Sequence, residues 1–168
     1  WMENKVSTKT HGAFSFQNAF FYLQWKDDPW VAASKTQSEA GLITLRKTRR
    51  RSKLHPHKQR SKYICKPRDV VEAGNHFVWE FITGRSTLNV PADAAILHHY
   101  RVCEFGGDDC VEAPSVIDRT AYKYREKLSD VVDKAWQDIG KHCYLPELDP
   151  IPLLSSLVPS SPDRIPTR

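Results

Sequence analysis

The sequence has few cysteines, no long apolar run and no zinc-finger spacing. Four cysteines in 168 residues are too few for a disulfide-dense scaffold. No C-x-x-C or paired Cys/His pattern occurs, which argues against a structural zinc site. No apolar stretch approaches the roughly 18 residues that a membrane-spanning helix needs, and the mean hydropathy is −0.55. The sequence also has no N-x-S/T site and no recognisable signal peptide.

The positive charge is concentrated in one segment. The net charge is +5, yet nine Lys and Arg side chains and no acidic one lie between Arg46 and Lys62, and acidic side chains outnumber basic ones elsewhere. Such a run is typical of a nucleic-acid or nuclear-localisation segment, or of a solvated loop. No aromatic residue interrupts it to stack on bases, so we expect a solvated basic loop over residues 46–60 and no nucleic-acid partner.

Local patterns predict short strands and one long helix. Six aromatic residues between His11 and Trp25 favour one strand or two short ones. Further strands are expected at residues 42–45, 61–67 and 76–82, and residues 92–101 are expected to form a short turn followed by a buried strand. Residues 68–74 suggest one or two helical turns that end at a glycine. Asp118 is expected to cap a helix that reaches Lys141, with an apolar face at Tyr124, Leu128, Val131, Val132, Ala135 and Ile139.

These elements define a mixed α/β protein, but not a complete doubly wound domain. A doubly wound sheet would alternate strands with several helices of 10–15 residues, and only one such helix is expected here. The chain also opens at Trp1 with Met2 behind it, so we interpret it as a fragment of a longer polypeptide. Residues 1–143 are assigned to the folded part. Residues 144–168, rich in proline and serine, are expected to be a disordered tail.

The strongest candidate for chemistry is the run His98-His99-Tyr100-Arg101. Neighbouring side chains on a strand point to opposite faces, so only one of the two histidines can face a cleft on the side of Arg101. An imidazole can ligate a divalent cation, and a guanidinium offers a planar fork to phosphate oxygens. The alternative is a strand end whose histidines are satisfied by packing and hydrogen bonds, which these residues alone favour.

Two smaller patterns leave alternatives open. Cys103 and Cys110 flank a glycine-containing turn, so they can form a local disulfide or remain two reduced thiols. The acidic pairs Asp27-Asp28 and Asp108-Asp109 lie among turn residues. Adjacent acids in turns usually face solvent, so we do not assign them to a metal.

Four segments, in this order and spacing, resemble the C-terminal half of glycosyltransferase family 92. They are Gly12–Tyr22, Ser61–Pro67 with Val70-Val71, His76–Glu80, and Leu97–Arg101 with Cys103. Each motif is short, and it is their succession over residues 11–143 that carries the resemblance.

The resemblance implies a partial GT-A-like domain with short mixed-sheet strands and a long C-terminal helix. It implies a hexosyltransferase that moves galactose from UDP-galactose to a glycan acceptor, with Mn²⁺ or another divalent cation as cofactor. It further implies a type II Golgi membrane protein with a lumenal catalytic domain. The D-x-D metal motif of such enzymes does not occur in this sequence. We expect it, and the membrane anchor, to precede Trp1, so that the fragment alone is inactive.

The resemblance also suggests roles for individual residues. One of His98 and His99 is the candidate metal ligand, and Arg101 is the candidate contact to the donor diphosphate. Glu80, beside Trp79, is the candidate base on the acceptor side. The aromatic segment from Phe14 to Trp25 could stack on the acceptor sugar, although core packing is its expected role.

Two other functions remain open at this point. The chain could be a non-catalytic binding domain whose basic loop contacts anionic partners. It could instead be a catalytically dead, truncated product of a transferase gene.

Overall fold

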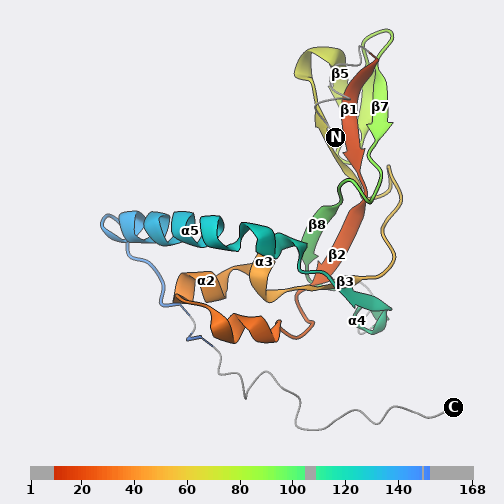
Figure 1. Cartoon of the computed structure of the whole chain (residues 1–168). Helices are drawn as coiled ribbons and strands as arrows, with labels where there is room; N and C mark the ends of the chain where they lie inside the picture. Colours follow the sequence, from red (N-terminus) through yellow and green to blue (C-terminus); the bar gives the residue numbers. More distant parts are fainter. Residues whose placement is uncertain (1–9, 105–108, 149, 152–168) are drawn as a thin grey trace, which may run out of the picture. The chain divides into compact units, whose positions relative to one another are not determined.

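The computed structural model describes residues 10–104, 109–148 and 150–151. They form a mixed α/β fold of short strands, short helices and one long helix (Figure 1), which confirms the predicted class at that level. The chain divides into two compact units. Unit 1 comprises Trp1–Phe21, Arg50–Arg101 and Ala113–Ser115, and unit 2 comprises Tyr22–Arg49, Val102–Glu112 and Val116–Arg168.

The elements have the following bounds. The strands are β1 (His11–Phe16), β2 (Asn18–Tyr22), β3 (Arg49–Arg51), β4 (Lys62–Cys65), β5 (Val70–Ala73), β6 (Val78–Phe81), β7 (Ser86–Asn89), β8 (Leu97–Arg101) and β9 (Ser115–Ile117). The helices are α2 (Gln37–Gly41), α3 (Ile43–Arg46), α4 (Asp109–Glu112) and α5 (Arg125–Gly140), with 3₁₀ turns η1 (Pro29–Ala33), η2 (Pro67–Asp69) and η3 (Thr120–Tyr124).

The strands form small sheets. The largest has the order β4-β1-β7, with β4 antiparallel to β1 (Phe14 opposite Ile64) and β7 parallel to β1 (Phe14 opposite Leu88). Three further pairs are β2-β8, β3-β9 and the antiparallel β5-β6. Figure 1 shows β1 beside β7, and β2 beside β8.

The aromatic segment forms two strands and supplies much of the core. Every residue of β2 is buried, and Phe14, Phe20 and Phe21 are at most 4% exposed. Aromatic side chains favour strands because they pack well across a pleated surface. Since both faces of β2 are covered, core packing is the role that the structure shows for these rings.

Residues 68–74 differ from their prediction. After the turn η2, Val70–Ala73 forms a hairpin with β6 in place of the expected helical turns. The β-branched pair Val70-Val71 favours strand, and that preference prevails here. Gly74 therefore closes the hairpin, where its N–H donates to the carbonyl of Phe77 (3.1 Å). A Cβ at this position would lie 2.5 Å from that carbonyl oxygen.

Unit 2 is built on contacts between α2 and α5. Thr36 caps α2 by accepting from the N–H of Glu39 (3.1 Å). Glu39 is 2% exposed and forms an ion pair with Arg125 of α5. Asp133, two turns along α5, accepts hydrogen bonds from the hydroxyls of Thr36 and Ser38. Polar contacts thus join the two helices.

Two predictions of secondary structure were wrong, one of a strand and one of the start of a helix. Residues 42–45, expected as a strand, lie largely in α3, whose turn closes with Lys47 N–H donating to Ile43 O (2.9 Å). The long helix begins at Arg125, not after Asp118, because η3 intervenes; Asp118 accepts from Thr120 N (3.1 Å) ahead of that turn. On the predicted apolar face of the helix, Tyr124, Val131 and Ile139 are 48–60% exposed.

The basic segment 46–60 contains more structure than a solvated loop. Arg49–Arg51 forms β3, and His55 makes an isolated bridge with Asn18 of β2. Of the expected tail, residues 144–148 and 150–151 carry no helix or strand, and residues 149 and 152–168 lie outside the described part.

Candidate functional site: the basic face of unit 1

The β2-β8 pair separates the candidate residues onto two faces. Around Phe20 lie His99, with ring centroids 5.2 Å apart, and Arg101, whose Cζ lies 5.0 Å from the ring centroid. The imidazole of His55 also packs on Phe20, at 4.3 Å. Alternation along β8 places His99 and Arg101 together, as the strand pattern predicts. This face therefore gathers three basic side chains around one aromatic ring.

His98 belongs to the other face. Its ring packs on Phe21 (4.6 Å between centroids), and Tyr100 packs on the same phenylalanine (4.8 Å). The hydroxyl of Tyr100 lies 3.4 Å from Nδ1 of His98. The two adjacent histidines therefore have different surroundings, and Arg101 shares its face with His99.

Asn18 determines the hydrogen-bonding state of His99. Its Nδ2 donates to the carbonyl of Arg60 (2.8 Å) and lies 3.0 Å from Nδ1 of His99. Because the Arg60 carbonyl can only accept, the amide orientation is fixed and Nδ1 of His99 must accept too. The imidazole is therefore neutral and carries its proton on Nε2. In this state Nε2 has no lone pair for a metal, which leaves His98 as the better candidate ligand.

The donor set for a cation is incomplete in the described residues. Among residues 10–104, 109–148 and 150–151, no group of three or more His, Cys, Asp or Glu side chains is placed to hold a metal ion. His98 could supply one ligand, on the face opposite Arg101. The residues present therefore do not fit a divalent cation by themselves.

A basic pocket adjoins this face. It has a volume of about 340 Å³ and is lined by Arg51, Lys53, Leu54, His55, Pro56 and Gln59. Burial lowers the pKa of His55, and the positive charges of Arg51, Arg60 and Arg101 lower it further. No acidic side chain lines the pocket, so it is electropositive.

Glu80 lies elsewhere in unit 1. It is on β6, opposite Glu72 in the β5-β6 pair, and its side chain is exposed. It belongs to a different sheet from His99 and Arg101 and does not line the basic pocket. The structure thus brings Arg101 and His99 together and leaves Glu80 apart from them.

The Asp27-Asp28 pair has a structural role in unit 2. Asp28 is 3% exposed and accepts from Thr48 Oγ1 (2.5 Å), Arg119 Nε (2.7 Å) and Trp30 N (3.0 Å). Burial acts to raise the pKa of Asp28, but these hydrogen bonds outweigh it and the net pKa is lowered. Asp27 is held by ion pairs with Arg46 and Lys47. Asp108 lies outside the described residues.

Cys103 and Cys110 form a disulfide in unit 2, with their Cα atoms 6.2 Å apart. That separation lies within the usual range for a disulfide. Cys65 and Cys143 are free thiols, and Cys143 is exposed. Of the two alternatives for the first pair, the structure adopts the bonded one.

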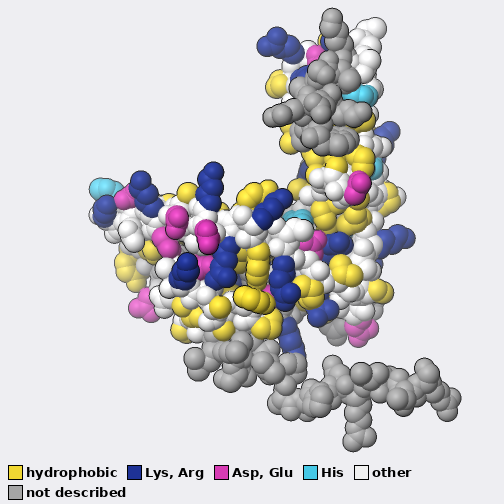
Figure 2. Space-filling view, in the orientation of Figure 1, with side chains coloured by type: hydrophobic (Ala, Val, Ile, Leu, Met, Phe, Trp, Pro, Cys, Tyr) yellow, Lys and Arg dark blue, Asp and Glu magenta, His cyan; other side chains and the backbone are white. Residues whose placement is uncertain are grey.

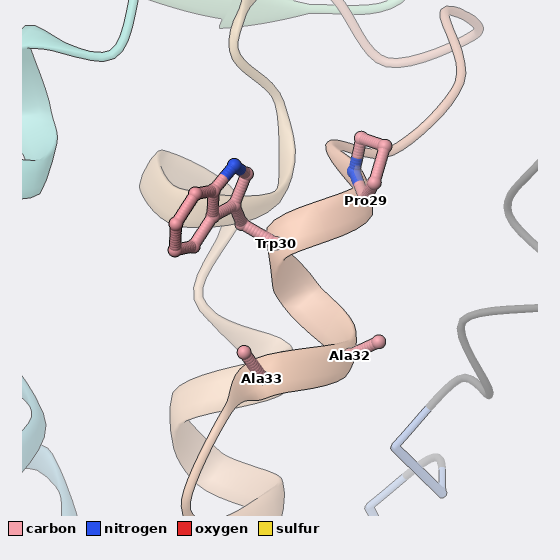
Figure 3. Close-up of a pocket in the computed structure, with 4 residues that line it drawn as sticks. All are labelled: Pro29, Trp30, Ala32 and Ala33. Carbon is pink, nitrogen blue, oxygen red and sulfur yellow. The ribbon is translucent and has the colours of Figure 1, made fainter.

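A second pocket, in unit 2, is apolar. It has a volume of about 260 Å³ and is lined by Pro29, Trp30, Ala32 and Ala33 of η1. Figure 3 shows the indole of Trp30 projecting from the turn on the same side as Ala33. An exposed indole (56%) offers a face for stacking, but the lining has no charged side chain to orient a ligand.

The fold and the site define a mixed α/β protein with an electropositive pocket beside a His/Arg strand end. Comparison with protein families matches residues 2–144 to glycosyltransferase family 92, and the chain belongs to this family. Its members' activity is glycosyl transfer, with a sugar donor and a glycan acceptor. Searches of curated proteins and of solved structures gave no significant match.

No described helix is long and apolar enough to cross a membrane.

Sequence reasoning missed the basic pocket. Arg51, Lys53 and His55 were assigned to a solvated loop because their neighbours along the chain are polar and basic. Of these residues, His55 has its partners, Asn18 and Phe20, more than 30 positions away in the sequence. The one available signal was the lack of any acidic residue between Arg46 and Lys62.

Proposed function

We propose that the chain is the C-terminal part of the catalytic domain of a galactosyltransferase with a GT-A-like fold. It would act with UDP-galactose as donor, a glycan as acceptor, and Mn²⁺ or another divalent cation as cofactor. The D-x-D half of the site would come from sequence outside these 168 residues, so the chain alone would be inactive. The parent protein would be anchored in the Golgi membrane with this domain in the lumen.

The main structural support for this proposal is that Arg101 and His99 share one face of β8, around Phe20. In glycosyl transfer, the bond from the anomeric carbon to the diphosphate breaks and negative charge builds on the departing oxygens. Fixed positive groups and N–H donors aimed at that charge lower the barrier. Arg101 offers a guanidinium fork, and His99 offers its Nε2–H.

The proposed cofactor is a divalent cation, for which this chain would supply only part of the ligand set. A divalent cation, when bound, would act as a Lewis acid toward the diphosphate oxygens. From this chain, one of His98 and His99 would contribute a single ligand, and the tautomer of His99 favours His98. The acceptor-side base assigned to Glu80 has no structural support beyond its exposed position.

The test is a transfer assay on the native protein, captured from cells with an antibody raised against residues 10–104. We expect Mn²⁺-dependent transfer of galactose from UDP-galactose to a glycan, and no transfer by the recombinant 168 residues. Transfer from another UDP-hexose only would refute the donor assignment. Failure with every nucleotide sugar would refute the transferase assignment.

A second candidate function is binding of an anionic partner without catalysis, and the acid-free basic pocket favours it. A truncated, catalytically dead product would behave in the same way in the transfer assay. A native protein that binds heparin with a steep salt dependence, yet transfers no sugar, would support this alternative.

A further inference from the structure

One arginine of the basic pocket of unit 1 has a buried donor that is unpaired among the described residues. Nε of Arg51 is shielded from solvent and makes no hydrogen bond within the described part of the chain. A buried, unpaired N–H costs about 1–3 kcal/mol, and more for a charged group, so native proteins rarely leave one. An acceptor supplied by a ligand would satisfy it. Arg51 also lines the pocket, so its guanidinium belongs to the pocket wall.

Two basic side chains of the pocket lining, and one just beyond it, have no acidic partner in the described part of the chain. Arg51, Lys53 and Arg60 form no ion pair with any described residue. Arg46 and Lys47, from the same basic run, both pair with Asp27 in unit 2. Some side chains of the basic run thus form structural ion pairs, whereas Arg51 and Lys53 at the pocket do not pair with a described residue.

The pocket wall is fixed to the core of unit 1. The N–H of His55 donates to Asn18 O (2.9 Å), and the side-chain amide of Gln17 donates to His55 O (3.3 Å). The carbonyl of Arg60 accepts from Asn18 Nδ2, which anchors the far end of the same segment (2.8 Å). A wall held in this way loses little conformational freedom on binding, which favours affinity.

The basic pocket differs from the surface of unit 2 in its charge composition. On unit 2, acidic and basic side chains are intermingled along α5 (Figure 2). In the pocket, three basic side chains line a volume of about 340 Å³ with no acid. A pocket of that volume falls within the range of small-ligand sites.

We propose that this pocket binds an oxyanion, a phosphate or sulfate ester group of the ligand, through Arg51, Lys53 and His55. Arg51 would donate from its guanidinium, and Lys53 would contribute a mobile positive charge. The site does not depend on the proposed transferase activity. Two sources share this chemistry: the diphosphate of a nucleotide sugar, or the sulfate of an acidic glycan.

Calorimetric titration of the 168-residue chain tests the site. The probes are inorganic pyrophosphate, UDP, a trisulfated heparin disaccharide and its unsulfated counterpart. The variant Arg51→Gln removes the unpartnered donor, and Lys58→Gln is the matched control, because it removes one charge from the same run outside the pocket lining. Melting temperatures show whether each variant is folded. If Arg51→Gln is not, Arg51→Lys replaces it, because it keeps the charge but loses the guanidinium fork.

We expect at least one oxyanion probe to bind, with Kd raised about ten-fold or more by the Arg51 variant and less than two-fold by Lys58→Gln. Binding of pyrophosphate and UDP would identify a nucleotide diphosphate as the source. Preference for the sulfated over the unsulfated disaccharide, without UDP binding, would identify an acidic glycan. Absence of binding to every anion, or equal weakening by the Arg51 and Lys58 variants, would overturn the site. None of these readouts requires transferase activity, so the site and the proposed function fail separately.

Discussion

Asn18 on β2 holds Nδ1 of His99 on β8 at 3.0 Å, and the same amide nitrogen donates to Arg60 O at 2.8 Å. One side chain thus joins the neighbouring strand and the end of the basic segment. Asn18 is 1% exposed, so this junction is shielded from water. The chemistry available to His99 depends on it, since the donor leaves the imidazole proton on Nε2.

We predict that His99 is the Nε2–H tautomer in solution. Two-bond ¹H–¹⁵N correlation spectra of the imidazoles check this directly. The variant Asn18→Ala should release the constraint and lower the free energy of unfolding by about 1–3 kcal/mol, because two buried acceptors lose their donor. An Nδ1–H tautomer in the unsubstituted chain would contradict the assignment.

Gly74→Ala should destabilise unit 1. The added Cβ would lie 2.5 Å from Phe77 O and 2.4 Å from Nε1 of Trp79, and the carbonyl cannot move without opening the hairpin. Overpacking of this kind typically costs about 1–3 kcal/mol. Gly41→Ala is the control: no atom lies within 4 Å of its Cβ position, and α2 should gain up to about 1 kcal/mol. Chemical denaturation compares both variants, and equal stability for the two would refute the hairpin geometry.

The disulfide Cys103–Cys110 should be present in the native protein and should stabilise unit 2. Closing a loop of this length is expected to contribute about 2–3 kcal/mol. Non-reducing peptide mapping checks the bond, and the melting temperature of Cys103→Ser checks its contribution. Cys143→Ser serves as the control, because Cys143 is an exposed free thiol. Recovery of both Cys103 and Cys110 as free thiols would reject the prediction.

Unit 2 should lose stability in acid. The pKa values of Asp27, Asp28 and Glu39 are each lowered from usual values of 3.8, 3.8 and 4.5, because their hydrogen bonds to basic partners outweigh burial. A carboxyl whose pKa is lower in the folded state stabilises the fold above its unfolded pKa. That contribution is lost as the pH falls through the folded pKa. Unfolding free energy should therefore decline below about pH 4.5.

The variant Asp28→Asn isolates one of these groups. It should lower stability at pH 7 by about 1–3 kcal/mol, since Arg119 and Thr48 lose a charged acceptor. Its acid-induced decline should also be shallower than that of the unsubstituted chain. Identical pH profiles for the two proteins would mean that Asp28 does not contribute to the acid sensitivity.

Local sequence patterns predicted those strands well that consist of a short apolar or aromatic run bounded by turn residues. The strands β1, β2, β4, β6 and β8 all fall within predicted segments. The strand β7 was not predicted, because Ser86–Asn89 contains one strongly apolar residue and its pairing with β1 is long-range. Residues 42–45 were predicted as a strand, but most of them lie in helix α3, because tertiary contacts override local strand propensity.

The candidate site was predictable only in part. The alternation along β8 correctly separates His98 from His99, because it is a local property of a strand. The contacts of Phe20 with His55 and of Asn18 with Arg60 join residues far apart in sequence, and no local pattern encodes them. For the same reason the sequence predicted the positive charge of residues 46–60, but not that some of them line a cavity.

The most direct test of the account concerns Arg101. In the native protein expressed from its own locus, Arg101→Gln should lower kcat/KM for UDP-galactose by about 100-fold, the effect of removing one donor to a developing oxyanion. Arg68→Gln, an exposed arginine of η2, should leave it unchanged. Loss in the Arg101 variant alone, with an unchanged melting temperature, is the result the account predicts. Equal kcat/KM for the Arg101 variant and the unsubstituted enzyme would contradict the claim that this face of β8 contacts the donor diphosphate.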